Sequence, residues 1–130
     1  MMARPVNLRG LGKAARRKAP GTMNGMERAF YETMKSWAGI AAVEYEAVTF
    51  KLAPDTRYTP DFYVLRDSGT IQFYECKGFE FQHSMVKVKV AAARFPEFEF
   101  FMVRRIAKKH GGGWDIKLIG PAVTVAEDRE

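Results

Sequence analysis

The fold is decided by residues 57–78, which read RYTPDFYVLRDSGTIQFYECKG. Two runs rich in β-branched and aromatic residues flank Asp67-Ser68-Gly69, a short turn that ends in glycine. This pattern is typical of a β-hairpin. Both arms of the predicted hairpin also carry charged residues, and their positions point to a function.

The length of the turn predicts how the two arms pair. A three-residue loop with Gly69 in the left-handed conformation makes Arg66 and Thr70 the closing pair. Asp61 then lies directly opposite Glu75, and residues that face each other on one sheet surface have Cβ atoms about 4.5–5.5 Å apart. Two carboxylates held this close repel each other unless a proton or a cation lies between them.

Lys77 follows Glu75 by two residues, so the two side chains are predicted to share one face of the strand. A hard divalent cation bound by oxygen atoms would fit between the carboxylates. Cys76 points to the other face, where burial is favoured over nucleophilic chemistry. A two-residue loop would instead place Phe62 opposite Glu75 and remove the carboxylate pair.

The composition bounds the class of protein. A length of 130 residues, with 47% hydrophobic and 13% aromatic residues, predicts one globular domain. No run reaches the roughly 18 to 20 apolar residues of a membrane helix, and the start lacks a secretory signal. The single cysteine offers neither an internal disulfide nor a zinc cluster. We therefore expect a cytosolic protein with no membrane partner and no small-molecule cofactor.

The charge is concentrated at the N-terminus. The net charge of +6 matches the first 20 residues, which carry six basic and no acidic side chains. Residues 1–22 are predicted to form a flexible basic arm, and residues 121–130 a frayed acidic end. The arm is either a solvated terminus or a segment that adds salt-dependent affinity for phosphates. In the second case Arg16, Arg17 and Lys18 would contact nucleic acid.

A helix is predicted to begin after Asn24. Asn24 and Glu27 have the spacing of a capping box, and Gly39 can end the helix. The apolar residues of this segment fall on one stripe: Met26, Phe30, Met34 and Trp37. Glu27 has two interpretations, either as a cap acid or as a third acidic group beside the metal.

The remaining strands are predicted from alternation and burial. Residues 44–52 alternate as one strand, joined to the hairpin through the turn at Pro54-Asp55. Residues 97–104 form a buried strand parallel to the second hairpin arm, across a helical crossover. Residues 114–119 follow a triple glycine and form an edge strand.

The crossover is predicted to be a helix over residues 85–95, capped by Ser84 and ended by Pro96. Alternating valines leave a strand open as the other interpretation. Basic residues on this helix are either a solvated face or phosphate contacts. The nucleic-acid contacts that we expect on the helix and at the hairpin are Lys87, Lys89, Arg94 and Arg57.

Pro60-Asp61 on one arm and Glu75-Cys76-Lys77 on the other resemble the PD-(D/E)XK nuclease superfamily. The predicted order α, β, β, β, α, β with an added strand is similar to its core, and residues 24–120 resemble small phage-type endonucleases of the endonuclease I and Holliday junction resolvase kind. The resemblance implies an α/β (α+β) restriction-endonuclease-like fold for residues 23–120, with a mixed sheet of four to five strands flanked by helices. It also implies Mg²⁺, with Mn²⁺ as a substitute, held by Asp61, Glu75 and the backbone carbonyl of Cys76, with support from Glu27.

The resemblance further implies hydrolysis of DNA phosphodiester bonds to a 5′ phosphate and a 3′ hydroxyl, with Lys77 serving the attacking water. No recognition domain is visible outside the core, so recognition of DNA shape is favoured, with branched or junction DNA as the substrate. Cutting both strands of a junction requires a homodimer. The alternatives are a nicking or single-strand nuclease, a non-catalytic DNA-binding or assembly protein, and an ordinary surface hairpin with incidental charges.

Overall fold

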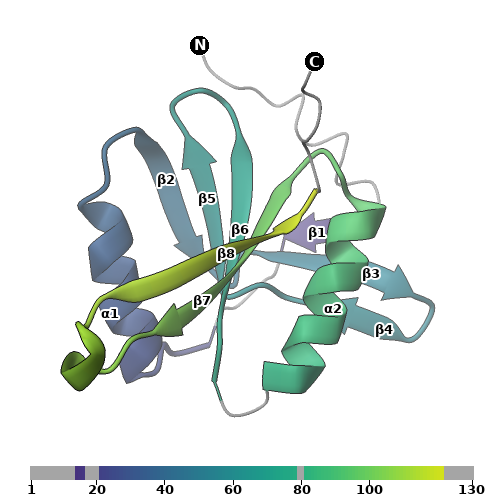
Figure 1. The fold of residues 1–130 in the computed structure, drawn as a ribbon. Coiled ribbons are helices and arrows are strands. Elements are labelled where there is room, and N and C mark those ends of the chain that lie inside the picture. The colour runs from purple at the N-terminus through teal and green to yellow at the C-terminus, as the bar shows by residue number, and fades with distance from the viewer. Residues whose placement is uncertain (1–13, 17–20, 79–80, 122–130) are drawn as a thin grey trace, which may run out of the picture.

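The predicted hairpin lies at the centre of a five-stranded mixed sheet in the computed structural model, which describes residues 14–16, 21–78 and 81–121 (Figure 1). The elements follow the chain in this order: β1 (Ala14–Arg16), α1 (Gly25–Lys35), β2 (Ile40–Tyr45), β3 (Val48–Ala53), β4 (Thr56–Tyr58), β5 (Phe62–Arg66), β6 (Ile71–Cys76), α2 (Phe81–Arg94), β7 (Glu99–Arg105), the 3-10 helix η2 (Lys108–His110) and β8 (Trp114–Gly120). Neither α1 nor α2, within these described residues, is long and apolar enough to cross a membrane.

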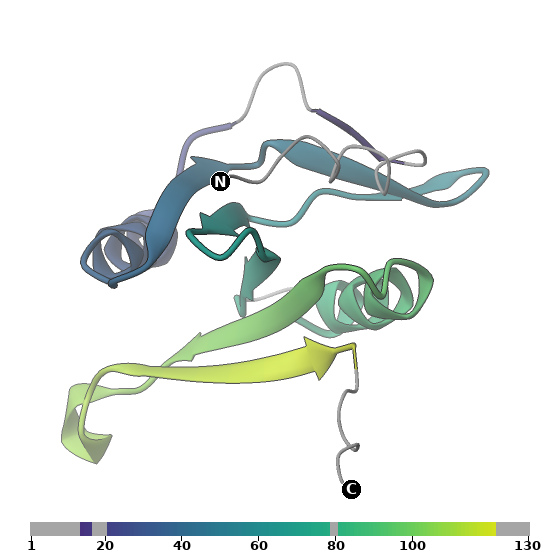
Figure 2. The same cartoon turned by 90° about the horizontal axis from the view of Figure 1, so that it is seen from above.

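The five-stranded sheet has the order β2-β5-β6-β7-β8, and a smaller sheet has the order β1-β3-β4. All neighbours are antiparallel except β6 and β7, which run parallel on either side of the crossover helix α2. The helices α1 and α2 lie on opposite faces of the larger sheet (Figure 2). The larger sheet and its helices therefore follow the predicted order α, β, β, β, α, β, β, and the fold is α+β.

The register of the hairpin is the predicted one. The loop is closed by the Arg66 amide, which donates to the Thr70 carbonyl over 2.9 Å, and Gly69 has a φ of +95°. Phe62 pairs with Tyr74, and the same register holds to the end of the hairpin. The three-residue loop is thereby confirmed, and Phe62 does not face Glu75.

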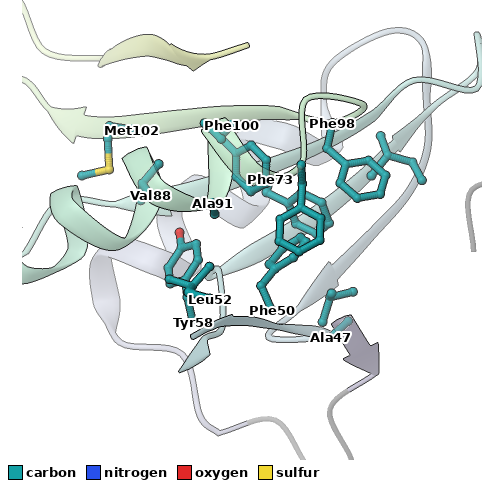
Figure 3. Packing of buried hydrophobic residues seen from close by; sticks show 14 residues of the cluster. Ala47, Phe50, Leu52, Tyr58, Phe73, Val88, Ala91, Phe98, Phe100 and Met102 are labelled. Carbon is teal, nitrogen blue, oxygen red and sulfur yellow. The ribbon is translucent and has the colours of Figure 1, made fainter. Parts of the chain in front are cut away.

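Each face of the larger sheet carries its own apolar cluster. On the α1 side, Phe30 and Met34 of the helix are fully buried, and Trp37 and Met26 pack beside them as the predicted stripe requires. The α2 side carries an aromatic cluster to which the smaller sheet also contributes (Figure 3). Its ring pairs join β3, β6, β7 and the connection between α2 and β7 through Phe50, Phe73, Phe95, Phe98 and Phe100.

The prediction of a single strand over residues 44–52 is wrong. The chain breaks at Glu46, which has a φ of +47°, and its amide donates to the Asp61 carbonyl over 2.8 Å. The two halves enter different sheets: β2 pairs with β5, and β3 pairs with β4. The first hairpin arm is divided in the same way at Pro60-Asp61, which separates β4 from β5.

The start of α2 also differs from the prediction. The helix begins at Phe81, before Met85, so Ser84 lies inside its first turn and is not the cap. The Ser84 side chain hydrogen bonds with Glu75 of β6 instead. The helix itself is confirmed over the alternative strand, and it ends at Arg94 just before Pro96.

The N-terminal arm was predicted to lack structure, but residues 14–16 form β1 and pair with β3. Arg16 is the last residue of this strand, whereas Arg17 and Lys18 lie outside the described residues. The predicted frayed end also falls outside them, apart from Pro121. The predicted parallel strand and edge strand are both confirmed, as β7 and β8.

Candidate active site

Asp61 and Glu75 lie on adjacent strands at the end of the hairpin. Asp61 immediately precedes β5, and the register that pairs Phe62 with Tyr74 makes Glu75 its opposite neighbour. The two residues are only 8% and 9% exposed. Glu75 also accepts a hydrogen bond from the backbone of Asp61, so the two residues are in direct contact. The carboxylate pair predicted from the sequence is therefore present and buried.

Each carboxylate of this pair has its own hydrogen-bond donors. The Cys76 amide donates to Asp61 Oδ2 over 2.8 Å. The Tyr58 hydroxyl donates to Glu75 Oε1 over 2.8 Å, and Ser84 bonds with the same carboxylate. In Figure 3 the Tyr58 ring lies at the edge of the aromatic cluster with its hydroxyl pointing toward α2. These donors fix the orientation of both carboxylates.

Burial raises the pKa values of the Asp61 and Glu75 carboxyl groups above those of free carboxyl groups. For Asp61, the negative charge of Glu75 raises the pKa further, and the Cys76 amide opposes the rise. For Glu75, the hydrogen bonds from Tyr58 and Ser84 oppose the effect of burial. The pair therefore retains protons at pH values where free carboxyl groups are ionised. A metal cation can replace such a proton, because metal binding requires deprotonated oxygen ligands.

The interpretation of Glu27 as a cap acid is confirmed. It forms a capping box with Asn24, and its Oε1 also accepts a hydrogen bond of 2.8 Å from the Tyr45 hydroxyl. At the same time a hydrogen bond with Glu27 and its negative charge raise the pKa of Asp61, so the two acids are neighbours. The structure thus brings Glu27, Asp61 and Glu75 together.

These three acids nevertheless do not form an open ligand set. In the part of the chain that the structure describes, no group of three or more His, Cys, Asp and Glu side chains is arranged to hold a metal ion. One oxygen of Glu27 is already held by the amide of Asn24 and the hydroxyl of Tyr45. The remaining candidate ligands are the carboxylates of Asp61 and Glu75, and the predicted contribution of Glu27 stays a prediction.

Cys76 is buried on the opposite face of β6, within the α1 cluster. Burial raises the pKa of its thiol, and the negative charge of Asp61 raises it further. The thiol therefore stays neutral at physiological pH, which agrees with its predicted role in packing. The predicted role of the Cys76 carbonyl as a metal ligand stays a prediction.

Lys77 directly follows β6, two residues after Glu75. It is half-buried, and its amide donates to the Val103 carbonyl of β7 over 2.7 Å. Its side chain lines a pocket of about 230 Å³. The other lining residues come from α2, β7 and β8: Met85, Met102, Val103, Arg104, Asp115 and Lys117. The residues that line this pocket include neither Asp61 nor Glu75.

The basic residues predicted on α2 have contacts within the protein. Lys87 Nζ donates to the carbonyl of Arg57 over 3.0 Å, and Arg94 donates to the carbonyl of Leu52 over 2.6 Å. Both side chains thus hold α2 against the strands β3 and β4. Lys89 and Arg57 are exposed. Contacts of these residues and of Arg16 with phosphates stay predictions.

Sequence reasoning missed Tyr58 and Ser84 as the partners of Glu75, and Tyr45 as a partner of Glu27. Their hydroxyls are the available signal, since a buried carboxylate requires hydrogen-bond donors. Burial and the nearby carboxylate also raise the pKa of the Tyr58 hydroxyl, which therefore remains a donor.

Comparison with known proteins adds no relative to this description. No family model matches the sequence, and neither a curated protein nor a solved structure matches the chain.

Proposed function

We propose that this protein is a Mg²⁺-dependent DNA endonuclease built on a restriction-endonuclease-like core. The observation that carries the proposal is the buried pair of Asp61 and Glu75 on adjacent strands. Two like-charged groups in this position reduce stability unless something neutralises them, and such pairs with raised pKa values are concentrated at functional sites. Lys77 directly follows the strand that carries Glu75, and it lines a neighbouring pocket.

The donor set fits a hard cation. Asp61, Glu75 and the Cys76 carbonyl offer oxygen atoms alone, which Mg²⁺ and Mn²⁺ prefer over nitrogen or sulfur. When bound, Mg²⁺ would polarise the phosphate and lower the pKa of a bound water. Tyr58 and Ser84 act as positioning residues, because they hold the Glu75 carboxylate in one orientation. Glu27 supports the arrangement through Asp61.

Lys77 supplies the positive charge that the reaction needs at its transition state. The oxygen of a water attacks phosphorus while the bond to the 3′ oxygen breaks, leaving a 5′ phosphate and a 3′ hydroxyl. Negative charge develops on the phosphoryl oxygens during this step, and a nearby ammonium group stabilises it. Lys77 either balances this charge or orients the attacking water.

For the substrate we propose branched DNA, read by its shape. The described residues are taken up by the two sheets and their helices, which leaves no separate recognition domain among them. Resolution of a four-way junction requires two nicks, so the active form would be a homodimer. A nuclease that nicks DNA or cuts single strands is the alternative within the same chemistry.

Cleavage of labelled DNA tests the proposal. Four-way junction, splayed-arm, single-stranded and linear duplex DNA are incubated with the wild type in Mg²⁺ or Mn²⁺, beside Lys77→Ala. The matched control is Lys35→Ala, which removes an exposed lysine from α1 on the far face of the sheet. Paired nicks near the branch point, lost in Lys77→Ala and kept in Lys35→Ala, would support a junction resolvase. Equal cutting of all four substrates would favour a general nuclease.

A non-catalytic DNA-binding protein is the second candidate. The observation that favours it is the Glu27 carboxylate, which the capping box and Tyr45 already hold. This protein would bind the four-way junction without cutting any substrate in either metal. The same assay with a binding measurement therefore separates the two functions.

A further inference from the structure

A second feature of the site lies across the sheet from the carboxylate pair. The strand registers pair Glu75 of β6 with Met102 of β7, and Met102 with Lys117 of β8. Residues paired in this way lie in one line across the sheet and point to the same face. Because adjacent strands are about 4.8 Å apart, Lys117 lies about 10 Å from Glu75 across the sheet. This row therefore carries an acid at one end and a base at the other.

A second row lies two residues further along each strand, on the same face. The Lys77 amide donates to the Val103 carbonyl, so the register of β6 and β7 continues past the end of β6 and places Lys77 beside Arg104. Arg104 in turn pairs with Asp115 of β8. An ion pair of 2.9 Å joins Arg104 to Asp115. The Arg104 side chain is 58% exposed and the Asp115 side chain is 50% exposed. Asp115 thus neutralises Arg104 in part, while Lys77 and Lys117 border the same space.

The two rows enclose the pocket of about 230 Å³ beside Lys77. Three cations, Lys77, Arg104 and Lys117, surround it against the single carboxylate of Asp115. The apolar side chain of Met102 forms part of its lining and is 4% exposed.

We infer that this pocket binds a phosphate of the DNA strand next to the phosphate that is cleaved, with Arg104 and Lys117 as its ligands. The inference rests on the proposed function and extends it by a second phosphate position. Lysine and arginine side chains are the usual partners of phosphate oxygens, and such contacts fix the position of the strand without reading its bases. The DNA strand would run across the β7 and β8 end of the sheet.

The site contains residues whose substitution should act in opposite directions. Lys117→Ala removes a ligand and should weaken phosphate binding roughly five- to tenfold. Asp115→Asn removes the competing carboxylate and should tighten binding by a similar factor. Both side chains are exposed, so neither substitution disturbs the core. General damage to the fold would weaken binding in both variants, which distinguishes it from the expected result.

An NMR titration with thymidine 3′,5′-bisphosphate measures this binding without any cleavage. The wild type should show shifts of the backbone amides of Met102, Arg104 and Lys117, with the opposite affinity changes in the two variants. Lys35→Ala, on the other side of the sheet, should bind as the wild type does. Unchanged affinity in Lys117→Ala, or weaker binding in an Asp115→Asn variant whose spectrum retains the wild-type fold, would overturn the inference.

DNA cleavage separates the failure of this inference from the failure of the proposed function. Lys117→Ala should raise KM roughly five- to tenfold at nearly constant kcat, and reduce the slope of log affinity against log salt by about 0.7 to 0.9. If the wild type cuts DNA and the variant keeps its KM and salt slope, the phosphate pocket is wrong and the nuclease stands. If the bisphosphate binds as expected but no DNA is cut, the pocket is a phosphate-binding site and the proposed nuclease activity is wrong.

Discussion

Phe73 and Glu75 lie two residues apart on one face of β6, and both are buried, yet their surroundings differ completely. Phe73 packs against Phe50 and Phe100, with ring centroids 5.0 and 5.3 Å away. Glu75 instead bonds with Tyr58 and contacts Asp61. The aromatic end of the face stabilises the fold, whereas the carboxylate end reduces stability. On this face of β6, a residue of the hydrophobic core is therefore followed, two positions later, by a residue of the candidate site.

The largest expected effect concerns the aromatic end. Phe73→Ala should lower the free energy of unfolding by about 3 to 5 kcal/mol, because it removes a buried ring and leaves a cavity. Glu75→Gln keeps the side-chain volume and removes a buried charge, so it should leave the free energy unchanged or raise it. Urea unfolding of both variants measures the difference. An equal loss in both would break the contrast between the two ends.

The carboxylate end should dominate activity instead. Asp61→Asn and Glu75→Gln should each reduce kcat in Mg²⁺ by at least about a hundredfold, since each removes charge that the reaction needs. Glu99→Gln is the matched control, because Glu99 is a carboxylate of the same sheet that bonds with Gln72 away from the site. The steady-state rate of DNA cleavage decides the matter. If Glu99→Gln lowers kcat as much, the effect is not specific to the pair.

The pH dependence of stability sharpens the comparison further. The pKa values of Asp61 and Glu75 are raised in the folded protein, so their contribution to stability is complete below the ordinary carboxyl pKa of about 4. This contribution is lost as the pH rises through the raised values. The Tm of the metal-free protein should therefore fall from acidic to alkaline pH.

Asp61→Asn should flatten that profile. At alkaline pH its Tm should exceed that of the wild type by roughly 4 to 8 °C, the shift that corresponds to about 1 kcal/mol in a domain of up to about 100 residues. Calorimetric scans across the pH range, without metal, provide the test. Parallel profiles for the wild type and the variant would mean that Asp61 does not titrate in this way.

The smallest expected effect comes from Tyr58→Phe. The substitution keeps the ring in the aromatic cluster but removes the hydroxyl that donates to Glu75. Since this hydrogen bond lowers the pKa of Glu75, its loss should raise that pKa and cost about 1 kcal/mol of stability. In a plot of kcat for DNA cleavage against pH, the rise on the acidic side should therefore move to higher pH. An unmoved rise would show that Tyr58 contributes to packing alone.

The register and the carboxylate pair could be predicted from the sequence because they depend on local chemistry. Gly69 fixes the turn, and the turn fixes which residues of the two arms face each other. The break at Glu46 could not be predicted, because a positive φ at a residue other than glycine gives no local signal. It is held by tertiary contacts, including the bond of the Glu46 amide to Asp61 and that of its side chain to the Gly21 amide.

The side chains that complete the site come from elements distant in sequence. Ser84 reaches Glu75 from α2. The local sequence instead predicted Ser84 as a helix cap, which gave no indication of this contact. The position of Lys117 depends on the register of β7 and β8, which are joined by residues 106–113. Because a shift of one residue in this register would reverse which side chains of β8 face the site, alternation alone could not place Lys117.

The central claim is that Asp61 and Glu75 form a metal-binding centre. Isothermal titration of Mg²⁺ into the wild type and Asp61→Asn, in buffers of different ionisation enthalpy, tests it most directly. The account predicts binding to the wild type with release of protons from the pair, and loss of that binding in the variant. Equal binding by both proteins, or no binding to the wild type, would contradict it.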